Sequence, residues 1–147
     1  MSVLFTTMFV TVLVVLVGDQ AIKLLVRRLV GGDAIALGAY GSVRVVTGQL
    51  WLRWLGGPIG DVTMWSIWAA ASISLVIAGA WAPLDPVFVG LLVGGSLSHA
   101  VESSMRGFVT DYICVRNWAF SLADMALAVG AIGVVVEFLL FFRQALT

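Results

Sequence analysis

Residues 120–142 read FSLADMALAVGAIGVVVEFLLFF, and the only ionisable side chains among them are Asp124 and Glu137. A helix that crosses a bilayer needs about 20 mostly apolar residues. This segment therefore predicts a transmembrane helix that begins near an acidic residue, Asp124.

Three further segments have the same apolar character: residues 3–30, 62–81 and 87–104. Pro83 and Pro86 mark a turn between the second and third segments. The third segment is rich in small residues such as Gly94 and Gly95, which let neighbouring helices approach closely. The first could instead be a signal peptide, but its start, MSVLFTT, lacks a basic region. Four spans predict both termini on one side of the membrane.

The composition of the whole chain agrees with a membrane protein. Of its 147 residues 61% are apolar and 11% are charged, whereas soluble domains carry about a quarter charged residues. Eight basic residues balance eight acidic ones, which excludes a basic surface for nucleic acid. One cysteine and one histidine are too few for a disulfide or a structural zinc site, so we expect no metal and no cofactor.

Two loops, residues 32–61 and 105–119, are expected on the same side of the membrane. Weak alternation in residues 42–47 and 49–54 indicates some β structure, and Trp51, Trp54 and Trp65 suggest a position at the lipid headgroups. A plain surface linker is the alternative. The predicted fold is a single all-α integral membrane domain of four transmembrane helices, with a small β-containing extracytoplasmic loop module.

Ionisable residues near membrane spans are costly and therefore indicate functional sites. Asp111 and Asp124 follow the third span and open the fourth, so their carboxyl groups can meet. Two adjacent carboxylates share a proton, as in aspartic proteases, although either acid alone could be a helix cap. Asp19 and Lys23 lie four residues apart and can pair on one helix face. Glu137 has no evident partner.

Three motifs, in order, resemble the lipoprotein signal peptidase (signal peptidase II) family over essentially the whole chain. They are Asp19-Gln20-Ala21-Ile22-Lys23, the segment from Gly94-Gly95 to Gly107-Phe108-Val109-Thr110-Asp111-Tyr112, and Phe120-Ser121-Leu122-Ala123-Asp124.

The resemblance implies an aspartic endopeptidase that removes the signal peptide of bacterial prolipoproteins ahead of a diacylglyceryl-modified cysteine. It implies that Asp111 and Asp124 are the catalytic pair, and that the partners are the prolipoprotein signal peptide and membrane lipid. It also implies a multi-pass protein of the bacterial cytoplasmic (inner) membrane with both termini cytoplasmic. The excess of basic residues on the loop side predicts the opposite orientation by the positive-inside rule.

The chain departs from the family pattern at several polar positions. His99 and Ser121 replace asparagines, Glu102-Ser103 replaces Asp-Arg, and Trp54 stands where the first loop usually has asparagine. Arg106, one helical turn beyond Ser103, is a candidate substitute for the missing arginine. The residues expected to position the site or bind substrate are Asp19, Lys23, His99, Arg106 and Ser121.

Two functions of other classes compete with the peptidase. One is a catalytically altered or silent homologue that binds lipoprotein precursors or a membrane partner. The other is a transporter or channel subunit with Asp19, Glu102 and Glu137 as an ion path, which is disfavoured because no inverted repeat is visible. For Asp19 and Lys23 a surface salt bridge competes with a role in holding the first span against the site, with Lys23 at lipid phosphate.

Overall fold

The computed structural model describes residues 2–30, 33–37, 41–48, 61–82 and 84–146. Along the chain they form α1 (Ser2–Leu29), β1 (Ile35–Ala36), β2 (Gly41–Gly48), α3 (Asp61–Trp81), α4 (Pro86–Arg106), β3 (Val109–Val115), β4 (Trp118–Phe120) and α5 (Leu122–Ala145).

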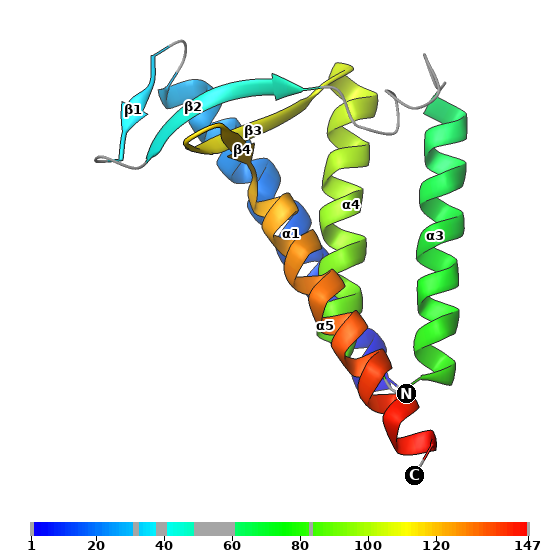
Figure 1. Cartoon of the computed structure of the whole chain (residues 1–147). Coiled ribbons are helices and arrows are strands. Elements are labelled where there is room, and N and C mark those ends of the chain that lie inside the picture. Colours follow the sequence, from blue (N-terminus) through cyan, green and yellow to red (C-terminus); the bar gives the residue numbers. More distant parts are fainter. Residues whose placement is uncertain (1, 31–32, 38–40, 49–60, 83, 147) are drawn as a thin grey trace.

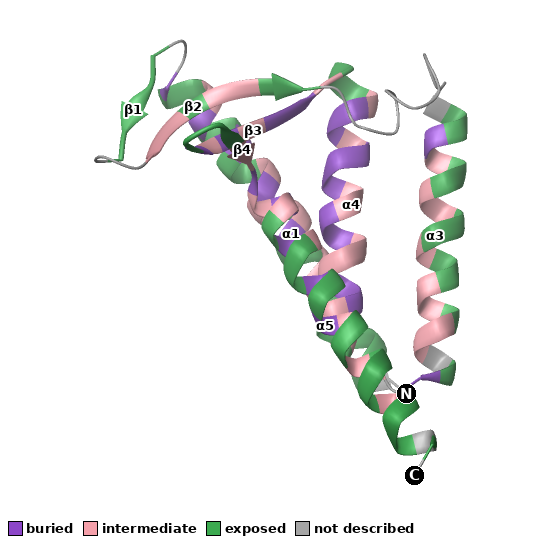
Figure 2. Ribbon diagram, in the orientation of Figure 1, coloured by how far each residue is buried: buried purple, intermediate pink, exposed green. Residues whose placement is uncertain are grey.

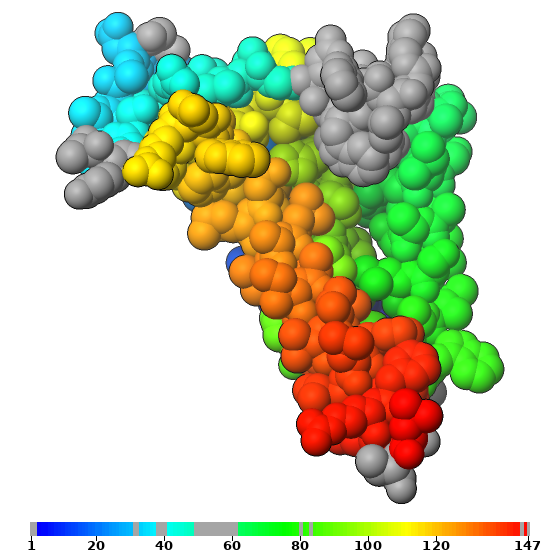
Figure 3. Space-filling view, in the orientation of Figure 1, coloured from blue at the N-terminus to red at the C-terminus, as the bar shows by residue number. Residues whose placement is uncertain are grey.

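All four predicted spans are confirmed as helices that are long and apolar enough to cross a membrane. Their outward faces are exposed, whereas buried residues gather along α4 and near the sheet (Figure 2). Both termini lie at the end of the helices opposite the sheet (Figure 1). The molecule narrows from the sheet end toward the end with the termini (Figure 3).

Helix α4 is the centre of the bundle and packs against α1, α3 and α5. Its glycines permit this packing, as the sequence predicts. A methyl group on Gly90 would lie 2.9 Å from the carbonyl oxygen of Met8 in α1. A methyl group on Gly95 would lie 2.7 Å from the carbonyl oxygen of Ala123 in α5. Backbone contact at these points leaves no room for a larger residue.

The two loops meet in one antiparallel sheet with the strand order β1-β2-β3-β4. The predicted strand at residues 42–47 is confirmed as part of β2. The strand expected at residues 49–54, with Trp51 and Trp54, lies outside the described residues. The second loop forms β3 and β4, and in β3 Asp111 pairs with Val46 of β2. Both loops therefore help to place the first candidate acid.

Glu137, for which the sequence indicates no partner, accepts a hydrogen bond from the turn that precedes α4. The backbone N–H of Asp85, which precedes α4, donates to its Oε2 at 2.8 Å. Asp85 in turn caps α4 through the N–H of Val87. Glu137 thus joins α5 to the start of α4 at the end of the bundle away from the sheet.

Candidate active site

Asp111 of β3 and Asp124 of α5 line one cavity of about 800 Å³. The cavity wall is mostly apolar and comes from α3, α4 and α5, through Met64, Ile67, Leu75, Leu92, Val93 and Leu127 among others. The fold therefore brings together the two acids that the sequence singles out, at the boundary between the helices and the sheet.

The environment of Asp111 disfavours its charged form. Burial and, to a smaller extent, the nearby charge of Asp124 raise the pKa of Asp111 to about 6, against the opposing effect of His99 and Lys23. A carboxyl group in this range can hold a proton in mildly acidic conditions and release it near neutrality. Asp111 is thus suited to acid–base chemistry.

Asp124 is surrounded by hydrogen-bond donors. The backbone N–H and the hydroxyl of Ser121 both donate to Oδ2 at 2.7 Å, and Nε2 of His99 lies 3.1 Å from Oδ1. With Ser121 as N-cap, the pair forms the capping box of α5. The capping interpretation is therefore correct for Asp124, yet 40% of its side chain stays exposed, and it also lines the cavity.

Asp19 is fully buried where α1, α4 and α5 meet. Its Oδ1 accepts the N–H of Ala123 at 3.1 Å, and its Oδ2 accepts the hydroxyl of Ser98 at 2.6 Å and contacts Nζ of Lys23 at 2.7 Å. Because Ala123 directly precedes Asp124, Asp19 fixes the backbone beside the second acid. The surface salt bridge considered for Asp19 and Lys23 is excluded by their burial.

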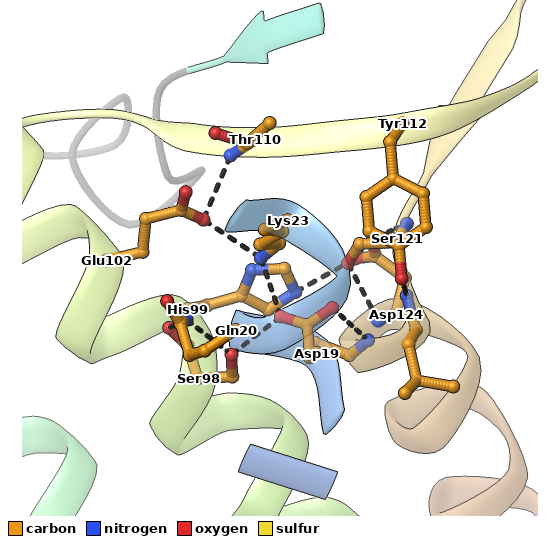
Figure 4. Close-up of polar contacts among 12 residues, drawn as sticks. Asp19, Gln20, Lys23, Ser98, His99, Glu102, Thr110, Tyr112, Ser121 and Asp124 are labelled. Atoms are coloured by element: carbon orange, nitrogen blue, oxygen red, sulfur yellow. Dashed lines mark hydrogen bonds and ion pairs between the residues drawn. The ribbon is translucent and has the colours of Figure 1, made fainter. Parts of the chain in front are cut away.

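Glu102 makes the equivalent contact beside the first acid. Its Oε2 accepts the N–H of Thr110 at 3.0 Å, and Thr110 directly precedes Asp111. Lys23 lies between the two carboxylates, with Nζ 2.9 Å from Oε2 of Glu102 (Figure 4). We call Asp19, Lys23 and Glu102 the clamp. The expectation that Lys23 reaches lipid phosphate is wrong, because its side chain is fully buried in the clamp.

Arg27 is a contributor that the sequence analysis missed. Its guanidinium group donates to Oε1 of Glu102 at 2.6 Å and to the hydroxyl of Thr110 at 2.9 Å. Arg106, the expected substitute for the missing arginine, lies exposed at the end of α4 instead. The four-residue spacing from Asp19 through Lys23 to Arg27 could have identified Arg27, since it places all three on one helix face.

Three further contacts hold the site together. Gln20 donates to the hydroxyl of Ser98 at 2.8 Å, and the N–H of Leu122 donates to the hydroxyl of Tyr112 at 2.9 Å. Burial raises the pKa of Tyr112 to about 12, so this hydroxyl stays neutral. Trp65 donates to Ser104 at 2.8 Å and thereby joins α3 to α4. Among the described residues no group of three potential metal ligands is found.

A family model described as signal peptidase (SPase) II matches residues 11–140. The lipoprotein signal peptidase of Rhodopseudomonas palustris strain TIE-1 is 28% identical over 95 residues, or 57% of this chain and 58% of the relative. The chain thus spans little more than half the length of that relative. The lipoprotein signal peptidase of Nitrobacter hamburgensis is 28% identical over 144 residues, or 83% of this chain and 85% of the relative.

The fold has counterparts among solved structures. A bacterial membrane enzyme determined by the in meso method at 1.9 Å resolution superposes with a TM-score of 0.73. The two chains are 19% identical, and the match covers 91% of this chain and 93% of the other. A second such enzyme, at 2.3 Å resolution, gives a TM-score of 0.66 at 20% identity. These similarities show that the four-helix arrangement with its sheet is shared.

Proposed function

Because this chain belongs to the signal peptidase II family, we propose that it is a membrane-embedded aspartic endopeptidase. Its substrates are bacterial prolipoproteins that carry a diacylglyceryl-modified cysteine, and it removes their signal peptides. Asp111 and Asp124 are the catalytic residues.

The meeting of Asp111 and Asp124 in one cavity is the observation that carries this proposal. Hydrolysis of a peptide bond by two carboxyl groups needs one to accept a proton from water while the other donates one. The shifted pKa of Asp111 and the donors around Asp124 support such a division. The apolar cavity wall suits the apolar core of a signal peptide.

The residues around the two acids position them in this proposal. Asp19 and Glu102 hold the backbone before each acid, while His99 and Ser121 orient the carboxylate of Asp124. Arg106 is not assigned a role, because it lies exposed at the end of α4.

In this proposal the protein lies in the bacterial cytoplasmic membrane, with membrane lipid around its four spans. The sheet and the two acids face the outside, where prolipoproteins are processed, and both termini are cytoplasmic. The four apolar helices support the multi-pass arrangement, and the family supports the direction.

The test is cleavage of a diacylated prolipoprotein by the purified protein, followed as a shift on a gel. Asp111→Asn and Asp124→Asn should each abolish cleavage, because each removes one partner of the proton transfer. Asp33→Asn is the matched control, since it alters an exposed acid on the same side of the molecule. Near-normal cleavage in either catalytic variant contradicts the assignment. Binding of the precursor without cleavage by the unaltered protein would favour the silent homologue.

A further inference from the structure

We propose that Asp124 is the ionised member of the catalytic pair, that Asp111 carries the proton, and that His99 is the positioning residue that maintains this difference. The inference rests on the proposed function and deepens it by assigning the two chemical roles. Neither the family match nor the motifs make that assignment.

The donors around Asp124 favour its ionised form. Ser121 donates two hydrogen bonds to one of its oxygens, and Nε2 of His99 lies within hydrogen-bond distance of the other. The backbone N–H of Ser121 can only donate, so a proton on Oδ2 would face another hydrogen. A carboxylate with two or three such donors is stabilised in its charged state.

His99 is held as a donor by its own surroundings. Its side chain is buried, with Nε2 directed at Asp124. Its other ring nitrogen, Nδ1, is also buried and has no hydrogen-bond partner among the described residues. Nε2 is therefore the ring nitrogen that can make a hydrogen bond here, and with its hydrogen on Nε2 the ring donates to Asp124 as an asparagine amide would.

Asp111 has the opposite environment. Within the described ranges no amide, hydroxyl or imidazole donates to its carboxyl group, and its pKa is raised by burial and by Asp124. The other charged groups around the pair largely offset one another. Asp19 of α1 contacts Lys23, and Glu102 of α4 contacts both Lys23 and Arg27. The proton of the pair therefore belongs on Asp111.

This difference in protonation assigns a separate chemical role to each acid. Asp124 takes a proton from water as the water oxygen bonds to the scissile carbonyl carbon, and Asp111 gives its proton to the carbonyl oxygen. The resulting diol collapses when the carbon–nitrogen bond breaks. Asp124 then passes its proton to the leaving nitrogen, and Asp111 recovers one from a diol hydroxyl. Both acids return to their starting states.

The first experiment compares two variants of similar size, His99→Asn and His99→Leu, in the gel-shift assay. His99→Leu removes the donor and should lower kcat roughly 10- to 100-fold. It should also move the acidic limb of the pH profile of kcat/KM to higher pH, because Asp124 then binds a proton more readily. His99→Asn restores a donor and should recover most of the lost kcat and the original limb.

Two outcomes of this comparison overturn the inference. An unchanged kcat and pH profile in His99→Leu would show that His99 does not position Asp124. An equal loss in His99→Asn and His99→Leu would show that the imidazole itself transfers protons. A purely structural role would lower the yield of folded protein without moving the pH profile.

The second experiment does not depend on cleavage and so separates this inference from the proposed function. Infrared difference spectra at about pH 5 detect protonated carboxyl groups when exposed acids are mostly ionised. We expect a carboxylic-acid band in the unaltered protein that is missing from Asp111→Asn. A band that persists in Asp111→Asn and disappears in Asp124→Asn would overturn the assignment even if cleavage is observed.

Discussion

Asp111 and Asp124 are chemically identical side chains that the fold places in different surroundings. Asp124 lies in the first turn of α5, where Ser121 donates to one of its oxygens and Nε2 of His99 lies 3.1 Å from the other. Asp111 lies in a strand, and burial raises its pKa to about 6. At the scale of single residues the two acids are therefore differentiated by their neighbours, which is what acid–base catalysis by a carboxyl pair requires.

The raised pKa of Asp111 predicts how stability depends on pH. An aspartate ionises near 3.8 when unfolded and at about 6 here, so the folded state is increasingly penalised as the pH rises between these values. Asp111→Asn removes that penalty. The variant should melt a few degrees above the unaltered protein at about pH 7.5, and most of this advantage should vanish at about pH 4.

Thermal unfolding in detergent at the two pH values is the measurement. Because Asp111 is partly exposed, solvent screening keeps the effect modest. Asp33→Asn, at an exposed acid, should show no such pH-dependent difference. An equal change in Tm at both pH values would mean that ionisation of Asp111 is not the cause.

At the scale of elements, α1 connects the two halves of the site. Asp19 reaches α5 beside Asp124, and Lys23 reaches Glu102, which holds β3 beside Asp111. Arg27 adds a second contact to β3 through Thr110. Removing one partner of such a buried charge pair leaves an uncompensated buried charge, which is strongly unfavourable, so the three clamp residues are expected to stay together. The clamp therefore sets the relative position of a helix and a strand.

Asp19→Ala should lower turnover at least about tenfold, because a displacement near 1 Å at the reacting groups can cost ~100-fold. The N–H of Ala123 loses its acceptor, and α5 is free to shift. Turnover is compared at equal amounts of folded protein in the membrane, with Asp33→Ala as the control for loss of an acid. Asp19→Asn, which keeps an acceptor for Ala123, should recover part of the loss. Turnover within about twofold of normal in Asp19→Ala would show that the clamp does not position the site.

The whole molecule has features that favour opposite orientations in the membrane. The sheet end carries most of the basic residues, and the positive-inside rule assigns such an end to the cytoplasm. Two of these residues, Lys23 and Arg27, are committed to internal ion pairs with buried acids. Their charge is locally compensated, which weakens the case for placing the sheet end inside.

We expect Gly48 on the external side and Thr147 in the cytoplasm. A single cysteine introduced at either position, in a Cys114→Ser background, is treated with a membrane-impermeant thiol reagent on intact cells. Cys114 is a free cysteine that is buried in the fold, and its removal ensures that any labelling comes from the introduced cysteine. Position 48, which is exposed at the end of β2, should react and position 147 should not. The reverse pattern would establish that the charge count predicts the orientation correctly.

The membrane class, the four spans and the two candidate acids could all be predicted from the amino-acid sequence. The length of an apolar segment decides whether it can cross a bilayer, and this property can be counted along the chain. The pairing of Asp19 with Lys23 is equally local, because residues four apart share a helix face. The three motifs predicted membership of the signal peptidase II family, which the family model confirms.

Which charges meet across elements depends on how the helices and strands pack, and the sequence does not predict it. Arg27 rather than Arg106 binds Glu102, Lys23 is enclosed instead of reaching lipid, and Glu137 accepts the N–H of Asp85. Such partners depend on how each helix is rotated and how closely its neighbours approach, which hydropathy along one segment does not specify. A buried charge then pairs with whichever opposite charge or hydrogen-bond partner that packing brings within reach, because leaving it unpaired costs far more than any local preference.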